Sequence, residues 1–522
     1  MVLDGRKKLT TGPKATLGPD GLAIARAAER FEQLLGPQAV LRDAASLAEF
    51  SDPYAGPEPT AYRPGLVIQP ASTEEVRAAV LLAGELGVPL WTSSMGRNFG
   101  YGGSSPVVDR SIVLNLRRMD RIIEIDADQG FARIEPGVTF ARLYEELRAQ
   151  DAPLMMSVPD LGWGSMIGNG LEHGYGYNVM GDHASALCGL EVVLANGDVL
   201  RTGQGGMPGS PLWSCHRRGY GPSLDSLFMQ SNFGVVTQAG VWLMPRPEAF
   251  MIGTITCHKD GDIVPLVALL RRLVRRGVLQ GIPMIVGTPE GVADVSPDMA
   301  PFTLANLKQV LRPGRWSVRI GLYGDEAMNK ARHAILAREL AEIPGAELDL
   351  RTYPGNAGPD EVEPRDYISA GIPNRLLLER LQAVFGTNFG HMDFSPVVPL
   401  DGEWALRVDK LAQATAARYD LIAPTGFLVQ ERSLVSACMV MFDASRAERV
   451  AAARQAVATM YATAAEWGCA PYRSHISLAD EVAQRFSAND HAYGRTCTRI
   501  KDALDPAGTL SPGNHGIWPG SC

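Results

Sequence analysis

The chain has 522 residues, of which 46% are hydrophobic and 20% charged, and its formal net charge is −8. This length predicts two or three domains, and the composition is typical of a soluble globular protein. The negative charge argues against nucleic acid as a partner, because a phosphate backbone is bound by clustered Lys and Arg. No apolar run approaches the ~20 residues that span a membrane, so no membrane association is expected.

The N-terminal segment and the cysteines indicate the compartment. Residues 1–8 include basic side chains, but no apolar core follows them, so they lack the pattern of a secretory signal. The seven cysteines are scattered, odd in number and without the C-x-x-C spacing of metal sites. We therefore expect reduced thiols in a cytoplasmic protein that binds no metal.

A compact α/β unit is predicted near the N-terminus. Residues 65–70 have the pattern of a strand, and residues 72–87 that of a capped amphipathic helix. A second apolar, strand-like run follows at residues 88–91 and leads directly into a glycine-rich loop at residues 92–103. Loops at strand ends of such sheets usually bind ligands.

The loop at residues 92–103 contains four glycines and three small hydroxylic residues. Glycine tolerates positive φ and close approach, so backbone N–H groups of such a loop turn inward around phosphate oxygens. The spacing fits neither the P-loop nor the Gly-x-Gly-x-x-Gly loop. By itself the segment fits a surface turn equally well, but two more glycine-rich segments follow at residues 159–169 and 174–183. Together the loops indicate an extended ligand with a pyrophosphate.

The pattern changes after a strand-like run at residues 234–244. Residues 250–470 alternate strand candidates (Ile252–Cys257, Trp316–Leu322, Phe427–Phe442) with helix candidates (Ile263–Gly277, Ala327–Ile343, Ala444–Trp467). A Gly/Pro/acidic loop is expected at residues 354–364, and no internal repeat is visible.

Several segments resemble one family of flavoproteins. They are residues 92–106, 134–138, 189–197, 231–237, 390–396, 471–475, 500–506 and 511–519. The chain resembles the vanillyl-alcohol oxidase / p-cresol methylhydroxylase family over nearly its whole length, and its 4-phenol-oxidising, eugenol-oxidase-like branch in particular. The resemblance implies an α+β fold, with a two-subdomain FAD-binding domain at 1–246 and 471–522. An antiparallel-sheet cap domain backed by helices is implied at 247–470.

The resemblance also implies how FAD is held. His391, which alone would be read as an ordinary core or loop histidine, falls on the position that bonds covalently to the 8α-methyl of FAD. Such a link raises the flavin potential, and because methylhydroxylase relatives use tyrosine, histidine favours the oxidases. Further FAD contacts are implied at Ser94, Gly96, Arg97, Asn98, Gly100, Gly102, Pro159, Gly164, Ser165, Gly168, Asn169, Gly174, Gly181, Asp182, Gly234, Val236, Arg473 and Asn514.

The implied catalytic residues are Tyr101, Tyr472, Arg473, Asp160 and Tyr177. Without the resemblance, Tyr101 would be interpreted as a residue that fills a loop, and Tyr472 and Arg473 as an ordinary pair at a strand end. Asp160 would be interpreted as the cap of a turn. In the family the first three bind the substrate as its phenolate, which is a better hydride donor than a phenol of pKa ~10. A guanidinium and two phenolic donors stabilise that anion in a dry site. The aspartate lies near flavin N5, and the last tyrosine matches an active-site tyrosine.

The implied reaction begins with hydride transfer from the benzylic carbon of a 4-alkylphenol or 4-hydroxybenzylic alcohol to N5. A para-quinone methide remains, which adds water or loses a proton, while dioxygen becomes hydrogen peroxide. A homodimer is implied. Two alternatives stay open: a dehydrogenase or hydroxylase that passes electrons to a cytochrome or another acceptor, and a catalytically inert flavin-binding paralogue.

Two stretches and two single residues depart from the family pattern. Asn178-Val179-Met180 replaces Thr-Pro-Tyr, and the stretch 430–436 lacks two histidines of the relatives, so a reshaped pocket is expected around the para substituent. Asn514 replaces a lysine. Asp393 replaces a small or apolar residue beside His391, where it would reject carboxylated substrates, receive a polar tail or point to solvent.

Overall fold

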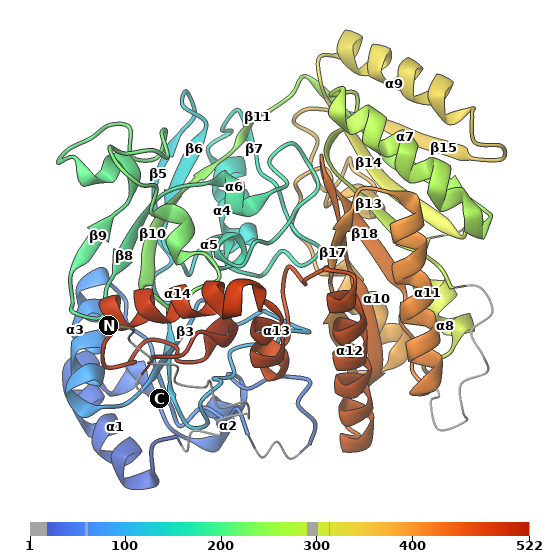
Figure 1. Cartoon of the computed structure of the whole chain (residues 1–522). Coiled ribbons are helices and arrows are strands. Elements are labelled where there is room, and N and C mark those ends of the chain that lie inside the picture. The colour runs from blue at the N-terminus through green and yellow to red at the C-terminus, as the bar shows by residue number, and fades with distance from the viewer. Residues whose placement is uncertain (1–17, 58–60, 290–300, 313, 521–522) are drawn as a thin grey trace, which may run out of the picture.

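The computed structural model describes residues 18–57, 61–289, 301–312 and 314–520. Its first sheet is small and mostly parallel, with strand order β1-β2-β4-β3. The strands are β1 (Val40–Leu41), β2 (Leu66–Ile68), β3 (Leu90–Ser93) and β4 (Ile112–Asn115), and the accompanying helices are α1 (Gly21–Leu35), α2 (Ala44–Ala48) and α3 (Thr73–Leu86). Helices α1 and α3 lie together at the lower left of Figure 1.

The predicted strand–helix–strand unit is confirmed. Ser72 caps α3 by accepting a hydrogen bond from the backbone N–H of Glu75 at 3.1 Å. Gly87 ends the helix with a left-handed φ of 64°. The buried side of α3, with Val76 and Val80, packs in one core with the strands. The glycine loop therefore leaves the carboxyl end of β3 at a fixed place.

A second, antiparallel sheet follows with strand order β5-β6-β10-β8-β9. Its strands are β5 (Ile122–Asp126), β6 (Phe131–Ile134), β8 (Leu187–Val193), β9 (Val199–Arg201) and β10 (Val235–Trp242). The helices of this part are α4 (Phe140–Ala149), α5 (Met166–Leu171) and α6 (His183–Ala186), and a short pair is formed by β7 (Leu154–Met155) and β11 (Met244–Pro245).

The largest sheet is antiparallel and has the strand order β15-β12-β14-β13-β18-β19-β17. Its strands are β12 (Ala249–Cys257), β13 (Gln280–Gly287), β14 (Trp316–Gly324), β15 (Glu347–Pro354), β17 (Val397–Pro399), β18 (Thr425–Val429) and β19 (Ser433–Ser436). A separate pair is formed by β16 (Phe389–Phe394) and β20 (Cys438–Asp443). The helices are α7 (Ile263–Arg275), α8 (Leu304–Val310), α9 (Glu326–Leu340), α10 (Leu376–Phe385), α11 (Gly402–Arg418) and α12 (Ala447–Glu466).

The two faces of this sheet have different partners. Alternate residues such as Ile255, Val318 and Phe427 share one core with helices α7, α9 and α11, on the outer right side of Figure 1. Residues of the opposite face, such as Leu428 and Val435, pack in the same core as residues of the second sheet. This arrangement of mixed helices and antiparallel sheets confirms the predicted fold class. The exact domain boundaries stay a prediction.

One predicted element is wrong in detail. The run Phe427–Phe442, expected as a single strand, forms β18, β19 and β20. A tight turn reverses the chain after β18, where the backbone N–H of Gln430 donates to the carbonyl of Ser433 at 3.0 Å. Strand β20 then leaves the large sheet and pairs with β16. The polar residues 430–433 mark the first of these breaks, whereas the second falls at Ala437 among mostly apolar residues and leaves no such signal.

The C-terminal segment returns to the first two sheets (Figure 1). It contains α13 (Ala479–Arg485) and α14 (Ala488–Leu504), and Leu510 forms a parallel bridge with Leu90 of β3. Buried Lys501 pairs with buried Asp505 at 2.7 Å and donates to the carbonyl of Asn232 at 2.8 Å. These contacts fix the C-terminal segment against β3 and the segment around Asn232.

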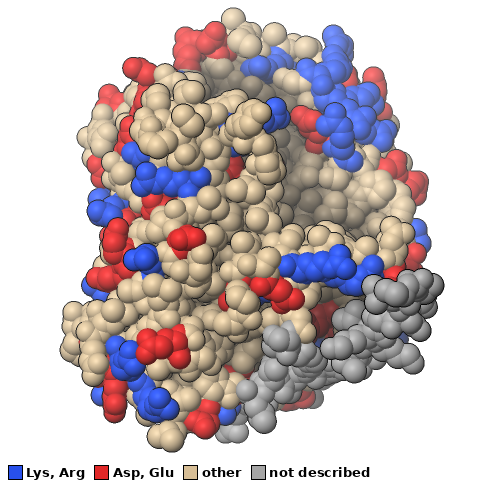
Figure 2. All heavy atoms as spheres, turned by 60° about the vertical axis from the view of Figure 1, so that its left-hand side comes forward, with Lys and Arg blue, Asp and Glu red and all other residues tan. Residues whose placement is uncertain are grey.

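Across the described residues no helix is long and apolar enough to cross a membrane. Six cysteines within this part are free thiols, and Cys522 lies outside it. Figure 2 shows a hollow in the surface that is lined mainly by uncharged residues, with charged side chains along its rim.

Candidate active site

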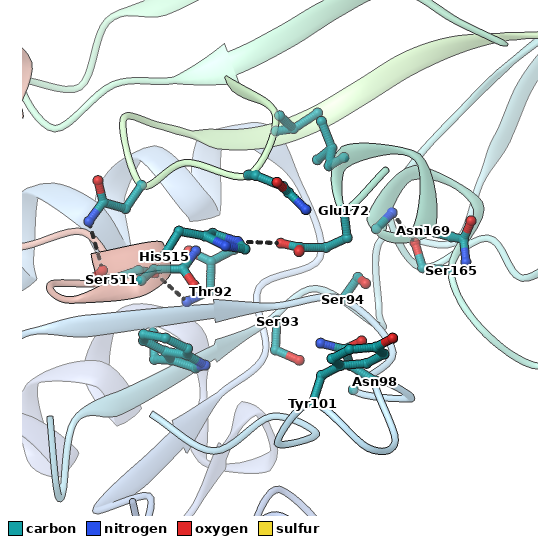
Figure 3. A pocket seen from close by; sticks show the side chains of 18 of the residues that line it. Thr92, Ser93, Ser94, Asn98, Tyr101, Ser165, Asn169, Glu172, Ser511 and His515 are labelled. Carbon is teal, nitrogen blue, oxygen red and sulfur yellow. Dashed lines mark hydrogen bonds and ion pairs between the residues drawn. The ribbon is translucent and has the colours of Figure 1, made fainter. Parts of the chain in front are cut away.

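A cavity of about 230 Å³ opens between the glycine loop, α5 and the C-terminal segment. Figure 3 shows hydroxyl and amide side chains directed into it from all three elements, among them Ser94, Asn98 and Asn169. Its lining also includes Gly96, Arg97, Gly164, Ser165, Gly168, Gly234, Val236, Arg473 and Asn514. The segments that build it are far apart in sequence, and the C-terminal fixation described above brings them together.

Glycine is required at the narrowest turn of the loop. Gly96 has a φ of 68°, and a Cβ there would lie 2.1 Å from Oγ of Ser104. Ser104 is held by a 2.7 Å hydrogen bond to Ser93. On the other side of the cavity, Ser165 caps α5 by accepting from the N–H of Gly168 at 2.9 Å. Backbone amides and hydroxyls thus line the walls with little side-chain bulk.

One ion pair crosses the cavity. Nε2 of His515 lies 3.2 Å from a carboxylate oxygen of Glu172, as the dashed line in Figure 3 shows. Burial tends to raise the pKa of Glu172, but His515 and Arg473 bring it below the usual value. Sequence reasoning assigned no role to either partner: His515 lies in the matched segment 511–519, and Glu172 lies between two glycine-rich segments.

Tyr101, Tyr472 and Arg473 converge beside this cavity. The two phenolic oxygens lie 3.4 Å apart, and Oγ of Ser395 lies 3.2 Å from that of Tyr101. The guanidinium of Arg473 is fixed by the carbonyls of Glu172 and Asn169, the second at 3.3 Å. It lies 5.6 Å from the ring centroid of Tyr101 and 5.4 Å from that of Tyr472.

The electrostatics of this cluster suit an anionic ligand. Burial raises the pKa of Tyr101 well above its usual value, and the Asp393 carboxylate adds to the effect. Burial lowers the pKa of Arg473, but the neighbouring Tyr472 and Glu172 bring it above the ordinary value in net. Tyr101 is therefore a protonated donor, and Arg473 a permanent cation, at any pH of interest.

A second cluster is formed by Asp160, Tyr177 and Arg319. One carboxylate oxygen of Asp160 accepts from the hydroxyl of Tyr177, and the other lies 3.1 Å from the guanidinium of Arg319. That guanidinium also stacks over the Tyr177 ring, 3.8 Å from its centroid. Burial and the Asp160 charge raise the pKa of Tyr177 well above its usual value, and Tyr472 contributes in the same direction. The two clusters are thus electrostatically coupled.

The comparisons with known proteins agree with this geometry. A family described as an FAD binding domain matches residues 64–203. The 4-cresol dehydrogenase [hydroxylating] flavoprotein subunit of Pseudomonas putida is 31% identical over 504 residues, which are 94% of this chain and 95% of the relative. The chain belongs to the vanillyl-alcohol oxidase / p-cresol methylhydroxylase family of flavoproteins. The resemblance inferred from the sequence is confirmed.

Two solved structures of this family have the same fold. The 4-ethylphenol oxidase from Gulosibacter chungangensis, in an isoeugenol complex, has a TM-score of 0.88 and 32% identity and covers 97% of this chain and 100% of its own. A p-cresol methylhydroxylase with substrate bound has a TM-score of 0.86 and 29% identity, with coverage of 96% and 98%. The chain is accordingly an FAD-dependent oxidoreductase.

The residues of the cavity fit FAD. Gly96 admits close backbone approach, hydroxyl and amide groups supply neutral donors, and Arg97 and Arg473 supply positive charge. The one acidic side chain among the residues that line the cavity, Glu172, is paired with His515. Of the FAD contacts implied by the flavoprotein family, those at Gly100, Gly102, Pro159, Gly174, Gly181, Asp182 and His391 do not line this cavity.

Several of these seven residues have evident local roles. Asp182 caps α6 by accepting from the N–H of Ser185 at 3.1 Å. A Cβ on Gly174 would lie 1.9 Å from Oδ1 of Asn169, so that glycine lets a cavity residue pack against the third loop. Gly100 lies against His391 in the same way. These close contacts explain why glycine stands at positions 100 and 174, although neither residue lines the cavity.

Arg319 is the main site residue that sequence reasoning missed. It lies in the middle of β14, opposite Thr254 of β12 and Met284 of β13, on the face that looks toward the second sheet. Only this register brings it to Asp160, 159 positions earlier in the chain. A single arginine in an apolar strand that matches the family only loosely does not indicate a site residue.

Asp393 has a clear position. Its carboxylate lies 3.0 Å from Nδ1 of His391, and its side chain is 15% exposed. The solvent-directed alternative is therefore wrong.

Proposed function

We propose that the chain oxidises para-substituted phenols, namely 4-alkylphenols and 4-hydroxybenzylic alcohols, at the benzylic carbon. The observation that carries the proposal is the convergence of two phenolic donors and a fixed guanidinium, Tyr101, Tyr472 and Arg473, beside the FAD cavity. A phenolate oxygen is the ligand that such a group of donors stabilises best. The names of the related 4-ethylphenol oxidase and 4-cresol dehydrogenase support the same substrate class.

FAD, when bound, supplies a hydride acceptor at N5 and is reoxidised by dioxygen, which becomes hydrogen peroxide. The chain's own residues bind the substrate as its phenolate and hold the benzylic carbon in place. Loss of hydride from the phenolate leaves a neutral para-quinone methide, whose carbonyl oxygen accepts hydrogen bonds from the same donors. Water then adds to the benzylic carbon of the quinone methide. A quinone methide formed from an alcohol substrate collapses instead to the carbonyl compound. A quinone methide formed from an alkylphenol gives an alkene when it loses a proton before water arrives.

Asp160 is proposed as the proton acceptor for the water that adds to the substrate. Its carboxylate is held from both sides, by the Tyr177 hydroxyl and by the Arg319 guanidinium. This fixed position is what a general base requires, because proton transfer depends on geometry before it depends on pKa. Arg319 also keeps the charge of the carboxylate balanced while the substrate is an anion nearby.

We further propose that FAD is linked covalently through its 8α-methyl to His391, that the terminal acceptor is dioxygen, and that the protein is a cytoplasmic homodimer. A histidine at position 391 supports the oxidase assignment. The alternative acceptor is a redox protein, as the name "flavoprotein subunit" of the Pseudomonas putida relative suggests for that protein. The intact Asp160 and Arg473 clusters argue against a catalytically inert paralogue.

The deciding experiment measures oxygen uptake and peroxide with 4-ethylphenol, vanillyl alcohol and eugenol, beside parallel assays with a dye acceptor. Peroxide formed in proportion to substrate supports the oxidase. Dye reduction without oxygen uptake supports the dehydrogenase. Absence of flavin bleaching with all three phenols under anaerobic conditions contradicts the proposed substrate class.

A further inference from the structure

His391 and Asp393 form an isolated pair at the edge of the FAD cavity. They are two positions apart on β16, so their side chains leave the same face of the strand. Nδ1 of His391 lies 3.0 Å from Oδ1 of Asp393, and the side chains are 12% and 15% exposed. Among the described residues Asp393 makes no ion pair with another basic side chain.

The imidazole is held in one orientation. Tyr54 and Phe389 pack against it with ring centroids 5.2 and 5.8 Å away. Gly100 of the glycine loop covers the pair: a Cβ there would lie 2.6 Å from Cε1 of His391 and 2.7 Å from Oδ2 of Asp393. Because Asn98 and Tyr101 on either side of Gly100 line the cavity, the pair lies directly behind the cavity wall.

This contact selects the tautomer of His391. In a neutral imidazole beside a carboxylate that accepts this hydrogen bond, Nδ1 carries the proton and the lone pair is on Nε2. Within the described chain no side chain or backbone group hydrogen-bonds Nε2. A neutral imidazole with a free Nε2 lone pair and an anionic partner on its other nitrogen is an activated nucleophile.

We propose that Asp393 is the positioning and proton-accepting residue for covalent attachment of FAD to His391, with Nε2 as the bonding atom. The inference rests on the proposed link at His391. An N–C bond forms between Nε2 and the 8α carbon, and one C–H bond of that methyl group breaks. Its proton goes to water and its electron pair stays on the isoalloxazine ring. The Nδ1 proton passes to Asp393, and dioxygen removes the two electrons with two protons as hydrogen peroxide.

The surroundings of Asp393 favour this role. Burial raises the pKa of Tyr54, and the charge of Asp393 raises it further; the same charge contributes to the raised pKa of Tyr101. Because the Asp393 side chain is only 15% exposed, solvent screens its charge little. The imidazole becomes positively charged as Nε2 forms its bond, and an unscreened anion 3.0 Å away stabilises that charge. The same anion disfavours a second negative charge nearby, so a role in binding a carboxylated tail is not supported.

The test compares FAD incorporation into the apoprotein for wild type, Asp393→Asn and a matched control, Asp443→Asn. Asp443 is a carboxylate of β20 in the same two-stranded sheet, and its side chain accepts from the hydroxyl of Ser445 at 2.6 Å. After FAD addition, samples are denatured at intervals and flavin bound to the chain is quantified by in-gel fluorescence and intact mass. Non-covalent FAD affinity is measured separately at short times.

We expect Asp393→Asn to incorporate FAD at least ~100-fold more slowly than wild type, the low end of general-base effects, with unchanged non-covalent affinity. Asp443→Asn should match wild type. Asp393→Gly, which resembles the small residue of relatives, should also be slow and should be accelerated by added formate. Incorporation at the wild-type rate in Asp393→Asn overturns the proposal, and a slow, formate-insensitive Asp393→Gly overturns the proton-accepting role. Covalent flavin in His391→Ala would instead contradict the proposed link itself.

Discussion

The phenolic oxygens of Tyr101 and Tyr472 lie 3.4 Å apart although 371 positions separate the two residues. Tyr101 belongs to the glycine loop that lines the FAD cavity, whereas Tyr472 and Arg473 belong to the returning C-terminal segment. The proposed phenolate site and the cofactor site therefore share their walls. Any change that moves the glycine loop should alter cofactor binding and substrate binding together.

Replacing Arg473 tests the phenolate site. Arg473→Ala removes the permanent cation and should slow anaerobic flavin reduction by 4-ethylphenol at least ~100-fold, which corresponds to about 2–3 kcal/mol of lost charge-assisted contact. Stopped-flow absorbance of the flavin measures this rate. The matched control is Arg338→Ala, whose side chain on α9 is 70% exposed. An unchanged rate in Arg473→Ala would remove that residue from the mechanism.

Arg319 and Asp160 should act as one unit. Arg319→Met keeps an unbranched side chain but removes the cationic partner of Asp160. Asp160→Asn removes the negative charge of the carboxylate. Each change should slow turnover by at least ~100-fold, as expected for loss of a general base. The double variant should be no slower than the worse single variant, because both remove the same interaction. Additive losses in this double-mutant cycle would show that the two residues act independently.

Gly96 should be needed for cofactor retention beyond its effect on stability. Gly96→Ala places a methyl group 2.1 Å from Oγ of Ser104 at a φ of 68°. The control is Gly87→Ala, which has nearly the same φ, 64°, but nothing within 4 Å of the new methyl group. Both should lose about 1–2 kcal/mol from the left-handed backbone. Only Gly96→Ala should lose FAD during gel filtration before covalent attachment. Equal retention would argue against close backbone approach at Gly96.

His183 should make the fold sensitive to acid. Burial lowers the pKa of His183 from its ordinary 6.5 to about 3. Its ring nitrogens are hydrogen-bonded to Asn169 and Ser157 at 2.7 and 3.1 Å. Between pH 6.5 and 3 the unfolded chain binds a proton at this residue that the folded chain does not, so stability falls as pH falls.

At pH 5 this loss should be about 2 kcal/mol relative to pH 7. His183→Gln cannot titrate, and its urea midpoint should fall less between pH 7 and pH 5 than that of wild type. Because Asn169 lines the FAD cavity, FAD release at low pH should decline in parallel in the variant. A variant with the same pH dependence as wild type would assign the acid sensitivity to other groups.

The local elements of the FAD site could be predicted from the sequence. Ser72, the strand–helix–strand order and the glycine loop each carry a local signal, and these elements lie where expected. The resemblance also predicted the residues of the proposed phenolate site, because Tyr472 and Arg473 belong to a short, distinctive motif. The convergence of these segments was implied by the family and could not be derived from spacing.

The unpredicted features depend on long-range register. Arg319 reaches Asp160 only because β14 lies between β12 and β13 with its odd-numbered residues facing inward. The pairing of Glu172 with His515 joins residues 343 positions apart. Such contacts follow from how sheets and termini pack, which no local pattern records.

The position of the C-terminal segment has a consequence for how the protein is made. Ser511, Asn514 and His515 complete the cavity, and the buried Lys501–Asp505 pair fixes this segment only after it has reached Asn232. During synthesis the nascent chain therefore lacks one wall of its cofactor site until residues 511–515 have been added. The cavity can therefore enclose FAD on this side only after the C-terminal segment has docked.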